Sequence, residues 1–493
     1  MCEVNLPKEN GGNEESLRRS CLVIGAGLAG LSAAYKLRLK GWHVTILEAR
    51  DRIGGRVFSY HFRENPDLYC ELGGEWVGDD HEQVMKLCDE FGLDLIRHRF
   101  DPSFAELGCI GETFQAGVWP FEKKLKKKLE TAVSKVLNLQ DAKKQKEFDA
   151  QDWWTFLRDQ GLSGKDLLRR DLMDSTDFGE SIRQAGAYSA SSEYYGEGSN
   201  STDEMDWRIK GGNTRLVNAL AERIGLASIH TSMEVQRLEQ SDGWVTIHAE
   251  DIRTVPFAPP QPRSKAARKK MPKKIRRFKA AYCICTVPAR VLNSIDWQPE
   301  LSEEKRLAAT NLQYARIMKT VLLFKTRFWE KRMGGKFSCF TDGTSDFVFA
   351  ASVGQLGNHD QGILCSYAIG DKADDLASRG TEDLRALIAA DLAKLFPGED
   401  TSPIAVERYA WQEDKYTQGA YAFYRPGQWF PVREALRNPH ERTISPVNIS
   451  QTNRASWMAR LTAETMPAVW SWRLIGTNTE MLRRRASPAN ERC

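Results

Sequence analysis

The 493-residue sequence lacks the features that mark secreted, membrane-spanning or metal-binding proteins. No apolar run approaches the length of a membrane span, and residues 1–18 are polar, without the hydrophobic core of a signal peptide. The ten cysteines are scattered without metal-ligand spacing, and Cys283–Ile284–Cys285 is typical of a buried strand. We therefore expect a cytoplasmic protein with reduced thiols, no metal and no membrane partner, whose residues 1–18 form a disordered tail.

The chain also lacks a strong charge of one sign. Lys and Arg number 70 against 66 Asp and Glu, a net charge of +4, which requires no nucleic-acid partner. A hydrophobic content of 41% and 14 tryptophans suit a packed globular protein. The chain is too long for one ordinary core, so two or three domains are expected.

The most informative pattern is a strand, a glycine-rich turn, a helix and a second strand that ends on an acid. These segments are Cys21–Ile24, the glycines Gly25, Gly27 and Gly30, the helical pattern Leu31–Leu39, and Val44–Leu47 with Glu48 after it. Gly25 permits the sharp turn, Gly27 lets the backbone approach a pyrophosphate, and Gly30 lets helix and strand pack closely. The helix N-terminus offers N–H groups to phosphates, and Glu48 can accept hydrogen bonds from ribose hydroxyls. The pattern indicates a dinucleotide site without separating NAD from FAD.

The next segment indicates which of the two cofactors the site binds. The stretch from Glu48 to Arg56 resembles the extended second motif of the flavin-containing amine oxidase family. The resemblance implies that Arg50, Gly54, Gly55 and Arg56 contact FAD, the paired glycines through close backbone approach and the arginines through positive charge.

Further segments extend the resemblance. Glu71–Gly78 is similar to the family's third flavin-contact segment, which implies FAD contacts at Gly73, Gly74, Glu75 and Trp76. The apolar spacing after it predicts an amphipathic helix over Glu82–Phe91. In the strand-like run Ile229–Leu238, Val235 stands where the family places backbone contacts to adenine.

A lysine within an apolar strand is the first candidate for the chemistry. Lys319 lies in the run Ile317–Phe324, where a charge is costly without a partner or a task. In the family this lysine faces the flavin and holds a water beside the reactive ring nitrogen, where a cation stabilises the charge that develops on dioxygen. The alternative is an edge-strand lysine that points to solvent, and Lys325, past the apolar run, is the weaker candidate.

The segment from Trp411 to Tyr421 resembles the family's Trp…Gly-x-Tyr element. The resemblance implies that Trp411 packs near the flavin and that Tyr421 forms one wall of an aromatic cage around the amine. Monoamine oxidases with covalent FAD carry a cysteine where this chain has Ala420. We therefore expect non-covalent FAD, a small-molecule amine substrate and O₂, with the hydride acceptor supplied by the cofactor.

The expected fold class is α/β: a Rossmann-like, glutathione-reductase-like FAD domain with an interleaved α+β substrate domain. The FAD domain is expected to comprise residues 19–95, 207–296 and 406–443, and the substrate domain residues 96–206 and 297–405. The part from 96 to 205 has mainly helical patterns, and strands at Trp244–His248 and Tyr282–Thr286 are expected to continue the FAD-domain sheet. Residues 255–279, with five Pro and ten Lys or Arg, are expected to be a loop that extends a hairpin, with an arm that touches an anionic surface as the alternative.

The resemblance runs from about Arg19 to Thr443, after which the family's glycine-rich closing segment is missing. Back-translation of the sequence after Thr443 in a shifted reading frame can yield such an ending. In that frame the codon that spans Trp457 and Met458 must encode Asp, and the codon that spans Met458 and Ala459 must encode Gly. The hypothesis is therefore that residues 444–493 are an aberrant tail translated out of frame, and the alternative is a divergent tail.

Other functions remain open at this point. An L-amino-acid oxidase needs an arginine for the substrate carboxylate, for which Arg183 is only a guess. A catalytically impaired flavoprotein and a basic binding module that uses residues 255–279 are further alternatives. The sequence determines neither the amine nor the oligomeric state.

Overall fold

The computed structural model describes residues 18–78, 81–98, 102–106, 109–113, 126–195, 207–253, 274–333, 337–355 and 360–444. All but residue 18 of the predicted N-terminal tail, most of the basic insert, and all but residue 444 of the predicted aberrant tail 444–493 thus lie outside the described residues. Among the helices described, none is long and apolar enough to cross a membrane.

The dinucleotide unit forms a parallel five-stranded sheet in the order β22-β13-β1-β2-β9. Its strands are β1 (Ser20–Ile24), β2 (His43–Leu47), β9 (Ile229–His230), β13 (Tyr282–Cys285) and β22 (Thr443–Ile444). Cys21 and Val23 face a core shared with α2 (Leu28–Leu39), α3 (Glu82–Phe91) and α9 (Thr214–Ile224), whereas Leu22 and Ile24 face a second core. Because both faces are covered, β1 is buried throughout and apolar from Cys21 to Ile24, as expected for a parallel strand. The predicted α/β class is confirmed.

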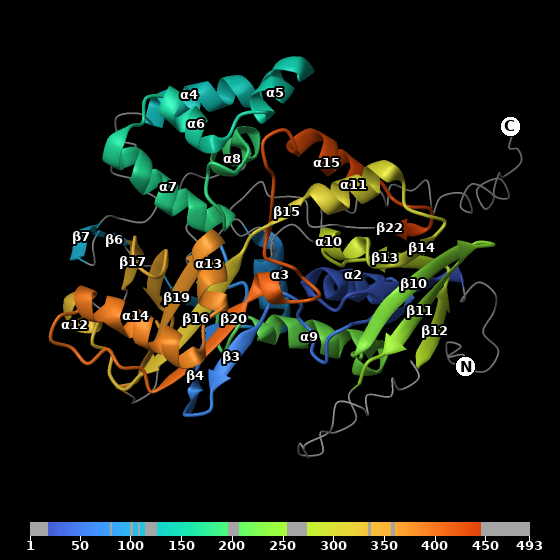
Figure 1. Ribbon diagram of the computed structural model, residues 1–493. Coiled ribbons are helices and arrows are strands. Elements are labelled where there is room, and N and C mark those ends of the chain that lie inside the picture. Colours follow the sequence, from blue (N-terminus) through green and yellow to red (C-terminus); the bar gives the residue numbers. More distant parts are fainter. Residues whose placement is uncertain are drawn as a thin grey trace, which may run out of the picture.

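A four-stranded sheet covers the second face, in the order β12-β11-β10-β14 (Figure 1). It contains β10 (Met233–Ser241), β11 (Trp244–Asp251), β12 (Ile275–Ala280) and β14 (Asp296–Gln298). The predicted single strand Ile229–Leu238 is wrong, because Ser232, at φ 56°, separates β9 from β10. The predicted strands around Trp244 and Tyr282 also lie in different sheets.

The predicted limits of the basic insert were partly wrong. Its last five residues belong to β12, which pairs antiparallel with β11, so the insert does join the two strands of a hairpin. Arg277 and Lys279 are exposed, whereas Phe278 between them is buried in the core. This alternation of exposed and buried residues is typical of a strand, but the many lysines and arginines of the segment made it look like a loop.

The third layer is a seven-stranded sheet in the order β20-β16-β19-β18-β17-β6-β7. The strands are β6 (Ser103–Glu106), β7 (Cys109–Thr113), β16 (Ile317–Phe324), β17 (Ser338–Thr341), β18 (Phe347–Ala350), β19 (Gly362–Ile369) and β20 (Ala405–Ala410). The mainly helical pattern predicted for residues 96–205 therefore missed β6 and β7. Because β20 pairs with β16, residues 405–410 lie with this sheet and not with the predicted FAD piece 406–443.

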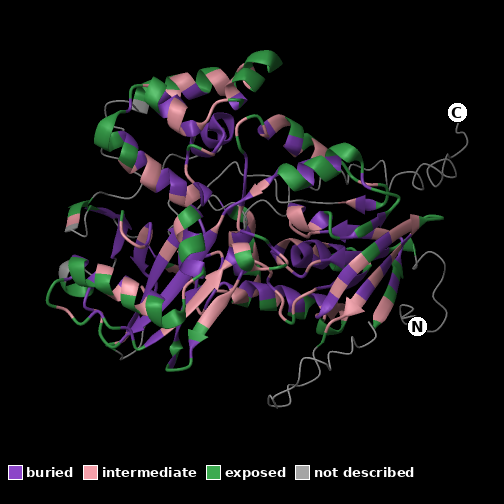
Figure 2. Cartoon of the chain, viewed as in Figure 1, coloured by how far each residue is buried: buried purple, intermediate pink, exposed green. Residues whose placement is uncertain are grey.

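Helices cover the seven-stranded sheet and extend above it (Figure 1). One group comprises α4 (Lys126–Leu137), α5 (Ala142–Asp149), α6 (Trp153–Asp159), α7 (Gly164–Phe178) and α8 (Ala187–Tyr195); another comprises α12 (Glu330–Met333), α13 (Gly370–Ala377) and α14 (Thr381–Leu395). The strands of the sheets are largely buried, whereas the helices present exposed residues outward (Figure 2).

Residues on both sides of the boundary expected at residue 296 pack in one core. The helices α10 (Ala289–Leu292), α11 (Glu303–Asn311) and α15 (Trp429–Arg437) share one core with β10, β11 and β14. Short pairs complete the fold: β3 (Ser59–Phe62) with β4 (Asn65–Glu71), β5 (Leu95–Arg97) with β8 (Trp207–Ile209), and β15 (Gln313–Tyr314) with β21 (Ala422–Phe423).

Candidate active site and cofactor pocket

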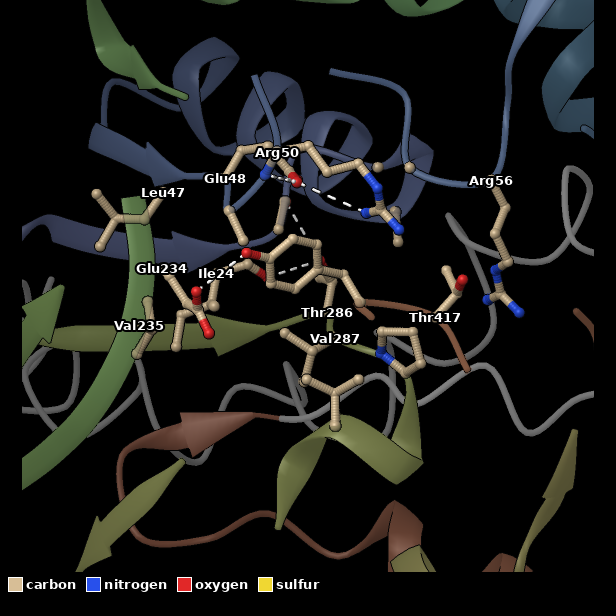
Figure 3. A pocket seen from close by; sticks show the side chains of 18 of the residues that line it. Ile24, Leu47, Glu48, Arg50, Arg56, Glu234, Val235, Thr286, Val287 and Thr417 are labelled. Carbon is tan, nitrogen blue, oxygen red and sulfur yellow. Dashed lines mark hydrogen bonds and ion pairs between the residues drawn. The ribbon is translucent and has the colours of Figure 1, made fainter. Parts of the chain in front are cut away.

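A pocket opens at the carboxyl ends of β1, β2 and β13, where β10 and the segment after β20 approach them (Figure 3). It gathers eight of the residues that the sequence predicts for FAD, from four separate segments: Gly25, Gly27, Glu48, Arg50, Gly54, Gly55, Arg56 and Val235. It also includes Thr286–Pro288 and Lys415–Gln418, which the sequence analysis did not assign to the cofactor.

The glycine turn is built as the sequence predicts. Gly25 has φ +99°, and a Cβ on Gly30 would lie 2.0 Å from the Gly25 carbonyl oxygen, so neither position accepts another residue without movement. Gly27 is the N-cap of α2 and contributes no side-chain cap. The first N–H groups of α2, at Leu28 and Ala29, therefore have no intrahelical acceptor, and both residues line the pocket. A helix N-terminus in this setting suits a phosphate.

Glu48 is buried at the end of β2 and is fixed by two backbone groups. Its Oε2 accepts from the Ala26 N–H at 2.8 Å, and its Oε1 accepts from the Arg50 N–H at 2.9 Å. A carboxylate has further lone pairs on both oxygens, so Glu48 retains acceptors for ligand hydroxyls. The Arg50 guanidinium in turn binds Asp414, whose other oxygen accepts from the Tyr409 hydroxyl. Arg50 thus connects the pocket to the Trp411 segment.

The glycines of the second and third motifs pack backbone against backbone. A Cβ on Gly55 would lie 3.1 Å from the Gly27 Cα, and one on Gly73 would lie 2.0 Å from the Arg56 carbonyl oxygen. The Gly74 N–H donates to the same oxygen at 3.0 Å. These contacts pack three separate loops against one another. The glycines are needed for this packing, because a side chain at Gly55 or Gly73 would push the loops apart.

Arg56 brings a half-buried cation to this pocket. Burial is the main cause that lowers the pKa of its guanidinium, with repulsion from Arg50 adding to it. Its guanidinium lies 6.0 Å from the Tyr314 ring centroid, and no carboxylate within the described parts of the chain forms an ion pair with it. A cation near an uncapped helix N-terminus fits a pyrophosphate. Together with Glu48, the residues present therefore fit a dinucleotide.

Lys319 lies on β16, next to the edge strand β20 of the seven-stranded sheet, with Tyr367 of β19 and Tyr409 of β20 directly opposite it. The alternative of a solvent-facing edge lysine is wrong, because β16 is flanked on both sides and Lys319 is only 7% exposed. Its ammonium donates to the carbonyl oxygens of Glu71 (3.1 Å) and Gly73 (2.9 Å) and to the Glu75 carboxylate (2.8 Å).

Glu75 and Trp76 lie beside Lys319. The second oxygen of the Glu75 carboxylate accepts from Arg208 at 2.8 Å, so both oxygens face cations. The Trp76 ring packs on Phe349 at 5.4 Å and under Arg208. None of the residues Glu71–Gly78 lines the pocket. The third motif packs on Arg56 through Gly73 and Gly74 and holds the Lys319 ammonium.

Trp411 and Tyr421 complete the predicted set. The Trp411 ring is buried, donates from Nε1 to the Leu72 carbonyl at 2.9 Å, and contacts the Tyr409 ring at 4.5 Å between centroids. The Tyr421 hydroxyl donates to the Thr176 carbonyl at 2.9 Å, as does that of Tyr367 at 3.3 Å. Tyr367 is thus a second aromatic residue beside Tyr421 that the sequence analysis did not name.

The guess at Arg183 has no support in the structure. Its side chain is exposed and stacks over the Trp154 ring at 3.4 Å, on the outer helices.

Comparison with known proteins agrees with these features. Residues 28–449 match the model of a family described as flavin containing amine oxidoreductase. The chain belongs to this family. Its cofactor is FAD, as the pocket and the motifs indicate. The match extends past Thr443, where the resemblance was expected to end, to residue 449.

Two curated relatives illustrate the range of the family. The probable flavin-containing monoamine oxidase A of Dictyostelium discoideum is 23% identical over 455 residues, which cover 85% of this chain and 89% of that protein. The L-amino-acid oxidase BjussuLAAO-I of Bothrops jararacussu is 26% identical over 478 residues, which cover 88% of this chain and 86% of that protein.

Solved structures share the fold. Putrescine oxidase bound to putrescine has a TM-score of 0.74 at 20% identity and covers 92% of this flavoprotein and 99% of its own chain. Cyclohexylamine oxidase from Brevibacterium oxydans IH-35A has a TM-score of 0.73 at 17% identity, with coverages of 91% and 98%.

Proposed function

We propose that this flavoprotein oxidises a primary amine, with non-covalent FAD as the electron acceptor and O₂ as the final oxidant. The observation that carries the proposal is the aromatic pair Tyr367 and Tyr421, whose hydroxyls both donate to the carbonyl of Thr176, the neighbour of Asp177 in the chain. Asp177 acts on both hydroxyls and helps to raise their pKa values, after burial as the main cause for each. A negative field beside aromatic faces attracts an ammonium group and repels a substrate carboxylate.

The chemistry balances without a side-chain nucleophile. The C–H bond next to nitrogen gives up a hydride, and bound FAD supplies the acceptor for it. Water hydrolyses the resulting imine to aldehyde and ammonia. The two electrons then pass to O₂ with two protons to give hydrogen peroxide, so that amine, water and O₂ yield aldehyde, ammonia and H₂O₂.

The roles of individual residues belong to the same proposal. Trp411 and Tyr421 form walls of the amine site and exclude water from it. Lys319 supplies positive charge where O₂ takes up electrons. The dinucleotide contacts are those of the pocket, with Glu48 on the ribose and the N-terminus of α2 on the pyrophosphate.

An L-amino-acid oxidase is the second candidate, because several relatives carry that name. Anaerobic reduction of the bound flavin by phenethylamine and by L-phenylalanine separates the two, since they differ by the carboxylate. We expect bleaching by the amine, and Asp177→Asn should weaken amine binding about tenfold, since one unit of charge near a partly desolvated site is worth about 1.4 kcal/mol or more. Bleaching by the amino acid alone, unaffected by this variant, would overturn the proposal.

The C-terminal hypothesis needs its own test, because residues 445–493 lie outside the described structure. We expect the visible spectrum of the purified chain, beside a version with the frame restored after Thr443, to show flavin bands in the restored protein. Equal bands in both would mean that the tail leaves FAD binding intact. Bands in neither would contradict the proposed flavoprotein.

Two finer points complete the proposal. Acid precipitation should release all the flavin into the supernatant, since Ala420 offers no thiol for a covalent bond. A cytoplasmic location agrees with seven described cysteines that are buried and free.

A further inference from the structure

Three charged side chains that meet at the seven-stranded sheet come from distant parts of the sequence. Glu75 follows β4, Arg208 lies on β8 and Lys319 lies on β16. Their side chains are 2%, 1% and 9% exposed, and the two cations contact different oxygens of the one carboxylate, each at 2.8 Å. Buried charges of this kind are costly unless each is paired.

The Lys319 ammonium has no N–H group to spare. An ammonium has three donors, and all three are used within the chain, by the carbonyl oxygens of Glu71 and Gly73 and by Glu75. Two of these acceptors belong to the third motif's own backbone. This arrangement locks both the position and the protonation of the nitrogen.

We propose that Glu75, anchored by Arg208, is a positioning residue that holds Lys319 as a fixed positive charge, so that Lys319 acts on the flavin site through its charge and not by donating a proton. The inference rests on the proposed role of Lys319 beside the flavin. It assigns to Glu75 a task other than the cofactor contact expected from its motif.

The surroundings of Lys319 support a fixed charge. Burial is the largest single effect and would lower the pKa of the ammonium, but the attraction and hydrogen bond of Glu75, together with Cys365 and Glu71, outweigh it and the pKa is raised. The other titratable groups that act on it are the Cys365 thiol and the more distant Glu71, and Arg208 is the second cation at Glu75. Without Glu75, burial would dominate, and Lys319 would lose its proton at a lower pH.

The test separates charge from proton transfer in the oxidative half-reaction. Bound FAD is reduced with dithionite, so that no amine substrate is needed, and is then mixed with O₂ at several pH values. We expect wild-type reoxidation to be nearly independent of pH between about 8 and 10, because Lys319 stays charged and Glu71, whose pKa burial raises to about 7, is already ionised there. The reoxidation rate of Glu75→Gln should be close to that of wild type at the lowest pH and about tenfold or more slower at the highest pH. Lys319→Met should be slower by a similar factor at every pH.

Two variants serve as controls. Asp174→Asn removes another buried carboxylate, paired with Arg170 at 2.6 Å, and should leave the pH profile unchanged. Lys319→Arg keeps a charge that cannot be donated as a proton, and should reoxidise much faster than Lys319→Met. A Glu75→Gln profile that matches wild type, or one that is slow at every pH, would refute the proposal, as would Lys319→Arg and Lys319→Met that are equally slow.

A second readout needs no flavin at all. In the flavin-free chain, the melting temperature of Glu75→Gln should fall below that of wild type most strongly near pH 6, because there the unpaired lysine must be buried with its charge. The deficit should narrow as the pH rises and the lysine becomes neutral. A difference in melting temperature between Glu75→Gln and wild type that stays constant with pH would refute the proposed effect of Glu75 on Lys319. This test does not depend on whether an amine substrate is found.

Discussion

Replacing Gly30 by alanine tests whether the turn at the start of α2 creates the cofactor site. The new Cβ would lie 2.0 Å from the Gly25 carbonyl oxygen and 3.1 Å from both Thr286 Oγ1 and Val23 Cγ1. Real Cβ contacts begin at about 3.0 Å, so α2 and the turn must separate by about 1.0 Å (3.0 − 2.0). The atom that must yield is backbone, which has no alternative rotamer.

The size of the effect follows from this displacement. Overpacking of a close contact costs about 1–3 kcal/mol, and we expect about 2 kcal/mol to be lost from the free energy of unfolding. The same shift moves the N–H groups of α2 that face the pocket. If about 1.4–3 kcal/mol of phosphate binding is lost with them, the Kd for FAD rises about tenfold to hundredfold.

The assay is titration of the flavin-free chain with FAD, followed by flavin fluorescence, beside thermal unfolding without FAD. Gly41→Ala is the matched control in the same unit, since Gly41 has φ +75° and a Cβ added there would meet no atom within 4 Å. It should cost about 1 kcal/mol of stability through its backbone alone and leave the Kd unchanged. A Gly30→Ala protein that binds FAD as tightly as wild type would refute the reasoning.

Three further variants test other parts of the molecule. Arg56→Gln should raise the Kd for ADP about tenfold and leave that for adenosine unchanged, since the guanidinium is expected on the phosphates; calorimetry would measure both, and equal losses would contradict that role. Asp149, whose pKa burial raises to about 6, accepts from the Trp429 N–H at the start of α15. Because the pKa of Asp149 is higher in the folded than in the unfolded chain, wild-type stability falls as the pH rises from about 4 to 7. The melting temperature of Asp149→Asn should therefore rise relative to that of wild type over this range. A constant difference would contradict the raised pKa of Asp149. Lys305 donates to the carbonyl oxygens of Leu436 (3.0 Å) and Asn438 (2.6 Å) at the other end of α15. Lys305→Met should cost about 1–3 kcal/mol by denaturant unfolding near neutral pH, and no loss would mean that these bonds are replaced by water.

Local patterns gave the elements of the cofactor unit with good accuracy. The glycines, the apolar runs and Glu48 follow one another within about thirty residues, so their spacing alone indicates strand, turn, helix and acid. The helix predicted at Glu82–Phe91 has the observed bounds. Predictions failed where charge masks alternation, as in β12, or where one residue with positive φ divides a run, as at Ser232.

The sequence by itself determined the family, the cofactor and most of the segments that line the pocket, because glycine turns and apolar strands are local devices. The tertiary structure alone decided which side chains face one another across hundreds of residues. Lys319 meets Glu75 across 244 positions, and Trp411 meets the Leu72 carbonyl across 339. No periodicity in one sequence encodes such pairs, since they arise only when sheets and loops pack and a buried charge must find its partner.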